Sequence, residues 1–552
     1  MAEIDYEIWR RWQDTGAGEL VAMAEQVANF ERRPTISLLM AAGERDELWL
    51  RDGVASLKRQ CYPNWELCVC QRGERSQVSD VLPSDPGDES RLRQVEAPPE
   101  DGQSIGDATL AAATGEYVAV LGEGDELAPD ALFRIVEALQ MGDADVLYTD
   151  EDTIDHHGER SKPVFKPRWS PDLLLSEPYL GRICVMRREL LELAGGLPAM
   201  PPEAAEWDAM LRVTEQATTV FHVAGVLYHR RAPAAGEANA PSSVADSSAA
   251  KIATVEASLG RRGEVGRARP ISGRAAMRVL YKESGKRKVS LIVQTTGRAT
   301  GRPLMLLRQL RRGIGGRPDE VIVTNRDAEA ESGFNVVYHA SPATAANLAA
   351  DEATGDVLVF VDGRGLIPGL GAGWLAELAS QAARDGVGAV SGRLMNRDET
   401  VRHGGTAVDL ADLCEPYLGP AEPEDAEILR LRGVLNPGAA SDYLLAIEAA
   451  TFRDAGGFDD THLSQRFFGL DLALRLDEQG LRSLYTPFAP LVCRDPHRRE
   501  PSAAEVAYMW RRWPSQLSRL QAERWPPNDL RRDLPPVAAE SLPSEIALGV
   551  DA

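Results

Sequence analysis

The feature that most constrains this fold is an internal repeat, because the second half of the chain restates the pattern of the first. The apolar run Ile36–Met40 has its counterpart in Val289–Val293. Ala113–Val120 is likewise matched by Ala353–Phe360, and both runs open with Ala-Thr-Gly and an acidic residue. The 552 residues also exceed the ~250–300 at which a single core stops growing. We therefore predict tandem copies of one domain.

Short apolar runs alternate with helical stretches within the first copy. We expect strands at Thr35–Met40, Trp65–Cys70 and Tyr117–Leu121, and helices at Leu48–Arg59 and Ile105–Ala113. Strands that alternate with helices at this spacing favour a mostly parallel sheet covered by helices. The predicted fold class is α/β.

The domain boundaries follow from where this pattern starts and stops. Residues 1–33 show helical periodicity and are expected to pack on the first domain, 34–285. The second domain is expected to take residues 286–500, followed by a helix and tail at 501–552. Residues 232–250 are low in complexity, which is typical of a linker.

The charge balance excludes one class of partner. The chain carries 84 acidic and 61 basic residues, with a net charge of −23. Such a field repels nucleic acid and anionic lipid, so we expect no nucleic-acid partner. Six cysteines in so long a chain do not form a disulfide framework.

The hydropathy pattern predicts a cytoplasmic protein without a transmembrane segment. Residues Met1–Gln13 are charged and lack the apolar stretch of a signal peptide. No run approaches the ~18 apolar residues of a membrane span. The tail segment Trp510–Trp513 could lie on a membrane interface, which leaves a peripheral position at the inner membrane as an alternative. The other account of these tryptophans is packing across the domain junction.

A stretch rich in acidic, basic and aromatic residues runs from Tyr148 to Arg188. It opens with the acids Asp150–Asp152, directly after the strand-like run Ala144–Tyr148. Ligands of an open α/β sheet bind beyond the carboxyl ends of its strands, so these acids would point into a crevice. For the three acids alone, an acidic helix cap with a solvated turn is the alternative.

Two runs in this stretch resemble the bacterial family 2 glycosyltransferases that build O-antigen and related surface polysaccharides. Thr149–Asp152 matches the family's Ser/Thr-D-E-D run, and Phe165–Leu175 matches F-K-P-x-W-S-P-D-L-L-L almost letter for letter. The resemblance implies two tandem GT-A-type, Rossmann-like domains with mixed, mostly parallel sheets. It further implies transfer of a sugar from a nucleotide-sugar donor to a polysaccharide or glycan acceptor.

The resemblance also implies roles for particular residues. Asp150 and Asp152 would contact the donor or its metal ion, and His229 with Arg230 would contact its phosphates. Glu206 and Asp208 stand where the family has its catalytic acidic helix start. Glu206 would be the general base, and Asp208 is expected to cap that helix.

The metal-binding run departs from the family's pattern. Where relatives carry D-x-D-D, this chain has Gly122, Glu123, Gly124 and Asp125. Glu123 and Asp125 could still offer Mg²⁺ or Mn²⁺ an E-x-D pair of oxygen ligands. The alternative is that arginines replace the cation, since their planar forks suit phosphate, and the candidates are Arg72, Arg230 and Arg231.

The second copy departs further from the same pattern. Asn325 replaces the nucleotide aspartate, Arg364 lies in the metal run, and Gly469 stands at the base position. We expect this copy to bind no nucleotide sugar and to share a buried interface with the first.

Two functions remain open at this stage. One is glycosyl transfer by the first copy, with a nucleotide sugar and a glycan acceptor as ligands. The other is a catalytically inactive pseudo-glycosyltransferase that recognises a glycan or scaffolds an assembly, with a protein partner or a second copy of the chain.

Overall fold

The fold was analysed in a computed structural model of the whole chain. The structure describes residues 6–43, 47–71, 91–98, 104–200, 202–232, 244–271, 276–282, 287–294, 306, 309, 318–324, 335–337, 339–363, 366–368, 373–396, 398, 400–403, 406–407, 415–416, 433–493 and 501–522. Arg72, Asn325 and Arg364 lie outside these residues.

The first domain is built on a mixed sheet with the strand order β3-β2-β1-β4-β8-β6-β9-β5, and β7 pairs with β6. Strands β1 to β4 are mutually parallel, as are β6 and β9, while β8 runs antiparallel to both of its neighbours. The strands are β1 (Ile36–Ala42), β2 (Trp65–Gln71), β3 (Leu92–Val95), β4 (Tyr117–Val120), β5 (Glu126–Leu127), β6 (Val146–Ile154), β7 (Arg160–Val164), β8 (Cys184–Arg187) and β9 (Val220–Arg231).

The second domain repeats this sheet position by position. Its order is β14-β13-β12-β15-β21-β17-β22-β16, with β18 paired to β17 as β7 is to β6. The strands are β12 (Val289–Gln294), β13 (Glu320–Thr324), β14 (Asn335–Val336), β15 (Val357–Asp362), β16 (Leu366–Pro368), β17 (Val387–Met395), β18 (Val401–His403), β21 (Leu444–Glu448) and β22 (Arg482–Cys493). The two sheets confirm the predicted fold class, an α/β fold with two tandem domains of the GT-A type.

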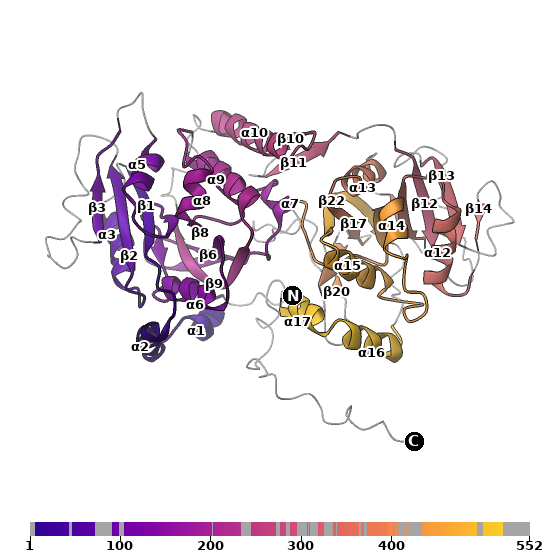
Figure 1. Cartoon of the computed structure of the whole chain (residues 1–552), viewed down its shortest axis with the longest axis horizontal. Coiled ribbons are helices and arrows are strands. Elements are labelled where there is room, and N and C mark those ends of the chain that lie inside the picture. Colours follow the sequence, from indigo (N-terminus) through magenta and orange to yellow (C-terminus); the bar gives the residue numbers. More distant parts are fainter. Residues whose placement is uncertain are drawn as a thin grey trace, which may run out of the picture.

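Helices cover both faces of the two sheets (Figure 1). Those of the first half are α1 (Tyr6–Gln13), α2 (Ala17–Gln26), α3 (Glu47–Lys58), α5 (Ile105–Ala112), α6 (Ala131–Met141), α7 (Pro171–Leu174), α8 (Arg188–Leu193), α9 (Pro202–Gln216) and α10 (Val244–Arg261). Those of the second half are α12 (Pro342–Glu352), α13 (Trp374–Ala382), α14 (Ala449–Asp454), α15 (Phe468–Glu478), α16 (Ala503–Arg512) and α17 (Pro514–Ala522). The remaining strands form two hairpins, β10 (Gly266–Pro270) with β11 (Met277–Tyr281), and β19 (Thr406–Ala407) with β20 (Glu415–Pro416).

The continuous apolar character of the central strands follows from burial on both faces. Leu38 and Met40 of β1 pack into one cluster, whereas Leu39 between them packs into the cluster on the other side. In β12, Leu291 and Ile292 divide between two clusters in the same way. A strand covered on both sides carries apolar residues toward both faces, so its sequence lacks the alternation of a half-exposed strand.

One hydrogen-bond network marks the two domains as copies. A serine in the first strand donates to a glutamate of the next strand, at 2.7 Å in the first copy and 2.6 Å in the second. The same serine oxygen accepts from a glycine N–H, at 2.8 and 2.9 Å respectively. The two trios are Ser37, Glu66 and Gly115, and Ser290, Glu320 and Gly355. The Ala-Thr-Gly repeat of the sequence is therefore the signature of this network.

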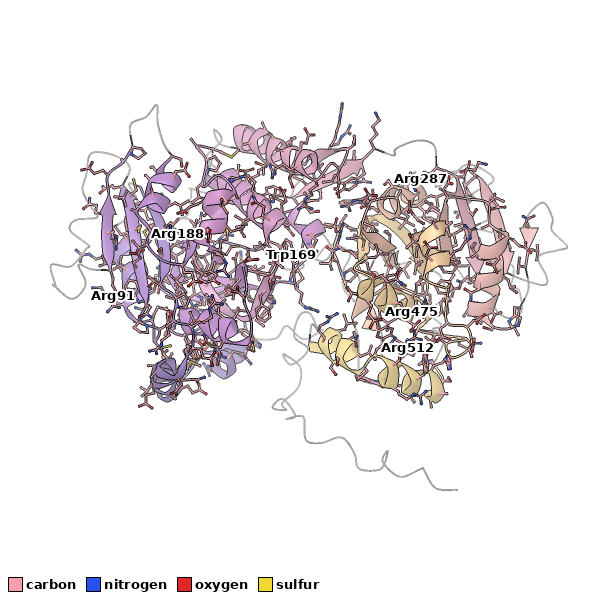
Figure 2. The ribbon with its side chains drawn as sticks, in the orientation of Figure 1. Arg91, Trp169, Arg188, Arg287, Arg475 and Arg512 are labelled. Atoms are coloured by element: carbon pink, nitrogen blue, oxygen red, sulfur yellow. The ribbon has the colours of Figure 1, made fainter. Side chains whose placement is uncertain are left out.

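The two domains share a buried junction, centred on α7. Asp172 on α7 forms an ion pair with Arg384 of the second domain at 2.6 Å, and accepts hydrogen bonds from Asn436 Nδ2 at 2.8 Å and Arg482 Nε at 3.3 Å. Ser170, the residue that caps α7, donates to Asn436 Oδ1 at 2.9 Å. In Figure 2, the nearby Trp169 lies on the side of the first domain that faces the second. The Ser-Pro-Asp part of the family motif thus joins the two copies.

The β10–β11 hairpin strengthens this junction. With α10 it lies across the top of the space between the two domains in Figure 1. Arg278 of β11 pairs with Glu377 of the second domain at 2.7 Å, and Tyr281 lies under the Arg384 guanidinium at 4.1 Å from its ring centre. These contacts agree with the expectation that the two copies share a buried interface.

Several expectations about local structure were wrong. Strand β6 continues through Asp150–Asp152 to Ile154, so these acids lie within a strand and not beyond its end. Helix α9 begins at Pro202, which places Asp208 inside the helix, where it cannot serve as the cap. Within the supposed linker, α10 already starts at Val244. Trp513 packs inside the second domain and not across the junction, and its Nε1 donates to Asp471 at 2.9 Å.

Among the described residues, we find no helix with the length and apolar character needed to span a bilayer.

Candidate active site

The three acids of β6 have different partners, and the pairing of β6 with β9 shifts register on both sides of Asp150. The Glu151 carboxylate contacts Lys166 Nζ at 2.9 Å and Arg230 Nη1 at 3.5 Å. Burial alone would raise the pKa of Glu151, but the charges of Lys166, Arg230 and Arg182 bring it below its usual value. Glu151 is therefore an ionised group beside three cations.

Asp150 and Asp152 are bonded to other protein groups. Asp150 contacts His222 Nε2 at 2.8 Å and accepts from the backbone N–H of Gly225 at 3.0 Å. Its Oδ1 also accepts from the backbone N–H of Lys166 at 2.7 Å. These bonds tie β6 to β9 and to the loop after β7.

Asp152 is enclosed in the same way. It accepts from Tyr6 of α1 and from Arg160 Nε, each at 2.6 Å, and contacts His229 Nδ1 at 2.7 Å. Burial alone would raise the pKa of Asp152, but His229, Arg160 and Tyr6 together hold it below its usual value. The structure thus brings His229 together with Asp152, while Arg230 lies beside Glu151.

A second cluster forms beyond the carboxyl end of β4. Asp125 accepts from Tyr228 of β9 at 2.5 Å, from Arg182 Nη1 at 2.9 Å and from the backbone N–H of Arg231 at 2.7 Å. Arg182 precedes β8, and its Nε lies 3.7 Å from Glu206 of α9. One guanidinium therefore links Asp125 to Glu206.

Glu206 is the member of this cluster suited to proton transfer. Burial of its carboxyl raises the pKa of Glu206, and the charges of Arg182 and Arg230 offset this effect only in part. Glu206 and Arg182 also line a cavity of about 10 Å³, the size of a single water molecule. A carboxylate with a raised pKa beside a cation and a cavity has the properties of a general base or acid.

The residues around Gly122 and Gly124 do not form a metal site of the kind the family resemblance implies. A side chain at Gly122 would collide with Arg182 Nη1 and with Asp125 Oδ2. Gly124 has a φ of +82°, and a Cβ there would lie 2.9 Å from the Cβ of Trp49. The Glu123 carboxylate accepts a hydrogen bond from the backbone N–H of Gly43 at 2.9 Å. Within the described part of the chain, no group of three His, Cys, Asp or Glu side chains could hold a metal ion.

Two further sequence candidates have structural partners. Arg231 is buried and pairs with Glu126 at 2.8 Å, and its Nε donates to the carbonyl of Gly124 at 3.0 Å. Asp208 pairs with Arg212 at 2.7 Å, and Arg212 donates to the carbonyl of Gly196 at 2.8 Å. Arg231 thus holds the glycine loop, and Asp208 orients an arginine that braces the turn after α8.

In the second copy, the carboxylate of Asp442 lies beside Gly469, the residue at the base position. Asp442 accepts from the backbone N–H of Gly469 at 2.8 Å and from that of Phe467 at 2.9 Å, at the start of α15. A Cβ on Gly469 would lie 3.0 Å from the same carboxylate. Asp442 is in turn paired with Arg466 at 3.3 Å. The helix start that carries Glu206 in the first copy therefore carries no acid at this position in the second.

Sequence reasoning missed Arg182 and Glu151. Glu151 stands in the acidic run with Asp150 and Asp152, and no local pattern indicates that it is the acid that contacts Lys166 and Arg230. Arg182 is one arginine beside an apolar run, and no local pattern indicates that its side chain reaches the position of a lost aspartate.

Two relatives of known sequence match nearly the whole chain, through both tandem sheets. The chain is 31% identical over 536 residues to the O-antigen biosynthesis protein RfbC of Myxococcus xanthus, across 92% of this chain and 41% of that protein. It is 28% identical over 547 residues to the uncharacterized protein y4gI of Sinorhizobium fredii (strain NBRC 101917 / NGR234), across 92% of this chain and 58% of that protein. No family model matches the chain.

The resemblance to bacterial family 2 glycosyltransferases of surface-polysaccharide biosynthesis is confirmed by the relative RfbC, whose similarity extends through both copies. The chain spans about half the length of these relatives, 41% of one and 58% of the other.

Similar solved structures are more distant. S. aureus TarS 1–349 in complex with UDP-GlcNAc is 14% identical, with a TM-score of 0.33 over 41% of this chain and 66% of that one. GalNAc-T7 with UDP, GalNAc and Mn²⁺ is 15% identical, with a TM-score of 0.34 over 46% of this chain and 53% of that one. At these scores the likeness carries no argument about function.

Proposed function

We propose that the first copy transfers a sugar from a nucleotide-sugar donor to a polysaccharide or glycan acceptor, with Glu206 as the general base. The observation that carries this proposal is the Glu206 carboxyl, whose pKa is raised by burial and which lines a cavity beside Arg182. Bond formation at the sugar requires a group that takes the proton of the attacking hydroxyl. A carboxylate whose pKa lies closer to the working pH does this more effectively.

The donor site proposed here differs from the one expected from the sequence. We assign donor binding to the group formed by Glu151, Arg182 and Arg230, at the carboxyl end of β4. Asp150, Asp152 and His229 are then assigned to holding α1, β6 and β9 together, since each already bonds protein groups. Asp208 is assigned to bracing Arg212.

Support for the acceptor class comes from the relative named an O-antigen biosynthesis protein, which matches 92% of this chain. The proposed setting is the cytoplasm or the inner face of the membrane.

A second candidate is an inactive protein that recognises a glycan or scaffolds an assembly. This candidate is favoured by the packing at Gly122, where any side chain would collide with Arg182 and Asp125. The position therefore has no room for the metal-binding aspartate that the family resemblance implies. A protein partner or self-association would then be the functional interaction.

The test compares Glu206→Gln with the matched control Glu203→Gln. Glu203 is an exposed residue of the same helix that pairs with Lys251, so its loss also removes a negative charge near Arg182 and Arg230. Purified full-length protein is incubated with a panel of nucleotide sugars and glycan acceptors, and nucleoside diphosphate release is measured. Loss of a general base costs ~10²–10⁴-fold in rate.

The expected result is that Glu206→Gln loses turnover by such a factor, while Glu203→Gln and the donor affinity of both variants stay close to wild type. Equal turnover in wild type and Glu206→Gln would remove Glu206 from the mechanism. Absence of turnover in wild type with every donor would favour the inactive candidate.

A further inference from the structure

The donor's diphosphate needs a counter-charge, and the glycine loop after β4 offers no metal site. We propose that Arg182 and Arg230 together bind the diphosphate in place of a divalent cation. This inference rests on the proposed function, because it names how the same site would hold its donor.

The loss of the metal position is built into the backbone. A positive φ of +82° at Gly124 is a conformation that favours glycine, and Trp49 leaves no room for a Cβ there. At Gly122 the space of the missing side chain is taken by the ion pair of Arg182 and Asp125. A cation from the protein itself therefore stands where relatives keep a metal-binding acid.

Arg182 is held in one orientation. Asp125, whose side chain is 3% exposed, bonds Nη1 at 2.9 Å, and Glu206 lies 3.7 Å from Nε. A guanidinium has five N–H donors in a fixed fork, so this bond leaves donors for a ligand. The Arg182 side chain remains 29% exposed, which makes it reachable from solvent.

Arg230 is the more accessible of the two arginines. Its side chain is 53% exposed, and its Nη1 lies 3.5 Å from Glu151 Oε1. Glu151 in turn packs against Gly181, where a Cβ would collide with the Glu151 carboxylate, and Gly181 directly precedes Arg182. The charges of both arginines act on the Glu151 and Glu206 carboxyls, so the two guanidiniums lie near the same pair of acids.

The size of the cavity indicates where a ligand would lie. At about 10 Å³ the space lined by Arg182 and Glu206 holds one water molecule and excludes a phosphate group. The diphosphate is therefore expected on the outer, exposed side of the two guanidiniums. There it would leave Glu206 free to reach the acceptor hydroxyl.

The probe for this site is inorganic pyrophosphate, which carries the diphosphate without committing to a base or a sugar. Binding to the full-length protein is measured by isothermal titration calorimetry in EDTA. The variants are Arg182→Gln, Arg182→Lys and Arg230→Gln, with Arg134→Gln as the control, since Arg134 is a half-exposed arginine of the same domain on α6. Circular dichroism and thermal melting check that each variant is folded.

The expected result is binding in EDTA that falls at least 10-fold in Arg182→Gln and in Arg230→Gln, falls less in Arg182→Lys, and is unchanged in Arg134→Gln. If Arg182→Gln does not fold, the exposed Arg230 decides the outcome. No pyrophosphate binding in EDTA, or binding equal to wild type in the Arg182 and Arg230 variants, would overturn the proposal.

The outcome is separable from that of the proposed function. Normal turnover that depends on Glu206, combined with unchanged binding in the arginine variants, would leave the transferase and refute the arginine site. Pyrophosphate binding that depends on both arginines, without turnover of any donor, would support the site and refute the transferase.

Discussion

The junction between the two copies makes a strong prediction about Asp172. Its side chain is 1% exposed and faces Arg384, which is 5% exposed, at 2.6 Å. Burial alone would raise the pKa of Asp172, but Arg384, Arg482 and Asn436 hold it well below its ordinary value. Asp172→Ala would leave the Arg384 guanidinium buried without its main counter-charge.

The expected loss of stability is large because removing one partner of a buried ion pair leaves the other charge buried without a partner. Removing one partner typically destabilises by ~3–5 kcal/mol, since the remaining charge is desolvated and uncompensated. The matched control is Asp477→Ala, which removes the partner of Arg519 in a pair whose side chains are 50% and 45% exposed. Pairs of that kind contribute ~0–1 kcal/mol.

The assay is urea denaturation of the full-length protein, followed by fluorescence and by circular dichroism. In Asp172→Ala we expect a lower midpoint for the first transition and separate unfolding of the two halves. A destabilisation below ~1 kcal/mol, equal to that of Asp477→Ala, would refute the claim that this junction is a buried structural contact.

The pH dependence of the same variant has a definite sign. The pKa of Asp172 is lower in the folded state than in the unfolded chain, so its contribution is fully present above the unfolded value of ~3.9. The contribution is lost as the pH falls below that value toward the folded pKa. The stability difference between wild type and Asp172→Ala should therefore be constant from pH 7 to ~5 and shrink below pH ~4.

Two further predictions concern the first domain. Gly124→Ala should destabilise by at least ~1 kcal/mol because of its φ of +82° and its contact with Trp49, whereas Gly142→Ala, with extended backbone and open space around it, should have a small effect in the same thermal melts. Tyr6→Phe should cost ~1 kcal/mol and increase hydrogen exchange in α1, because it removes the hydroxyl that donates to Asp152; unchanged exchange would show that α1 is held by other contacts.

The repeat and the buried strands could be predicted from the sequence because both are local patterns. Runs such as Ile36–Met40 are apolar on both sides of the strand, which suits a strand covered on both faces, and β1 is found at Ile36–Ala42. Strand order could not be derived in this way. The insertion of β8 antiparallel between β4 and β6 depends on contacts between segments distant in the sequence.

The candidate site was predictable only in part. Glu206 could be proposed because it stands in a recognisable motif at a helix, and the structure adds its burial and its cavity. The partners of Asp150 and Asp152 depend on the shifted pairing between β6 and β9, which brings together segments distant in the sequence. The role of Arg182 depends on the missing side chain at Gly122, because the Arg182 guanidinium occupies that space. The two residues are distant in the sequence and meet only in the folded structure.

The hairpin β10–β11 and α10 also decide where this chain can be divided. Five apolar side chains from these elements pack into the core of the first domain, and Leu435 and Tyr485 of the second domain enter the same cluster; the five are Val255, Leu259, Ala268, Met277 and Val279. A fragment cut before α10 would open one wall of that core. A fragment that starts after Tyr281 keeps the second sheet whole but exposes Leu435 and Tyr485 to water. Studies of either copy in isolation would therefore examine a protein with a new apolar surface.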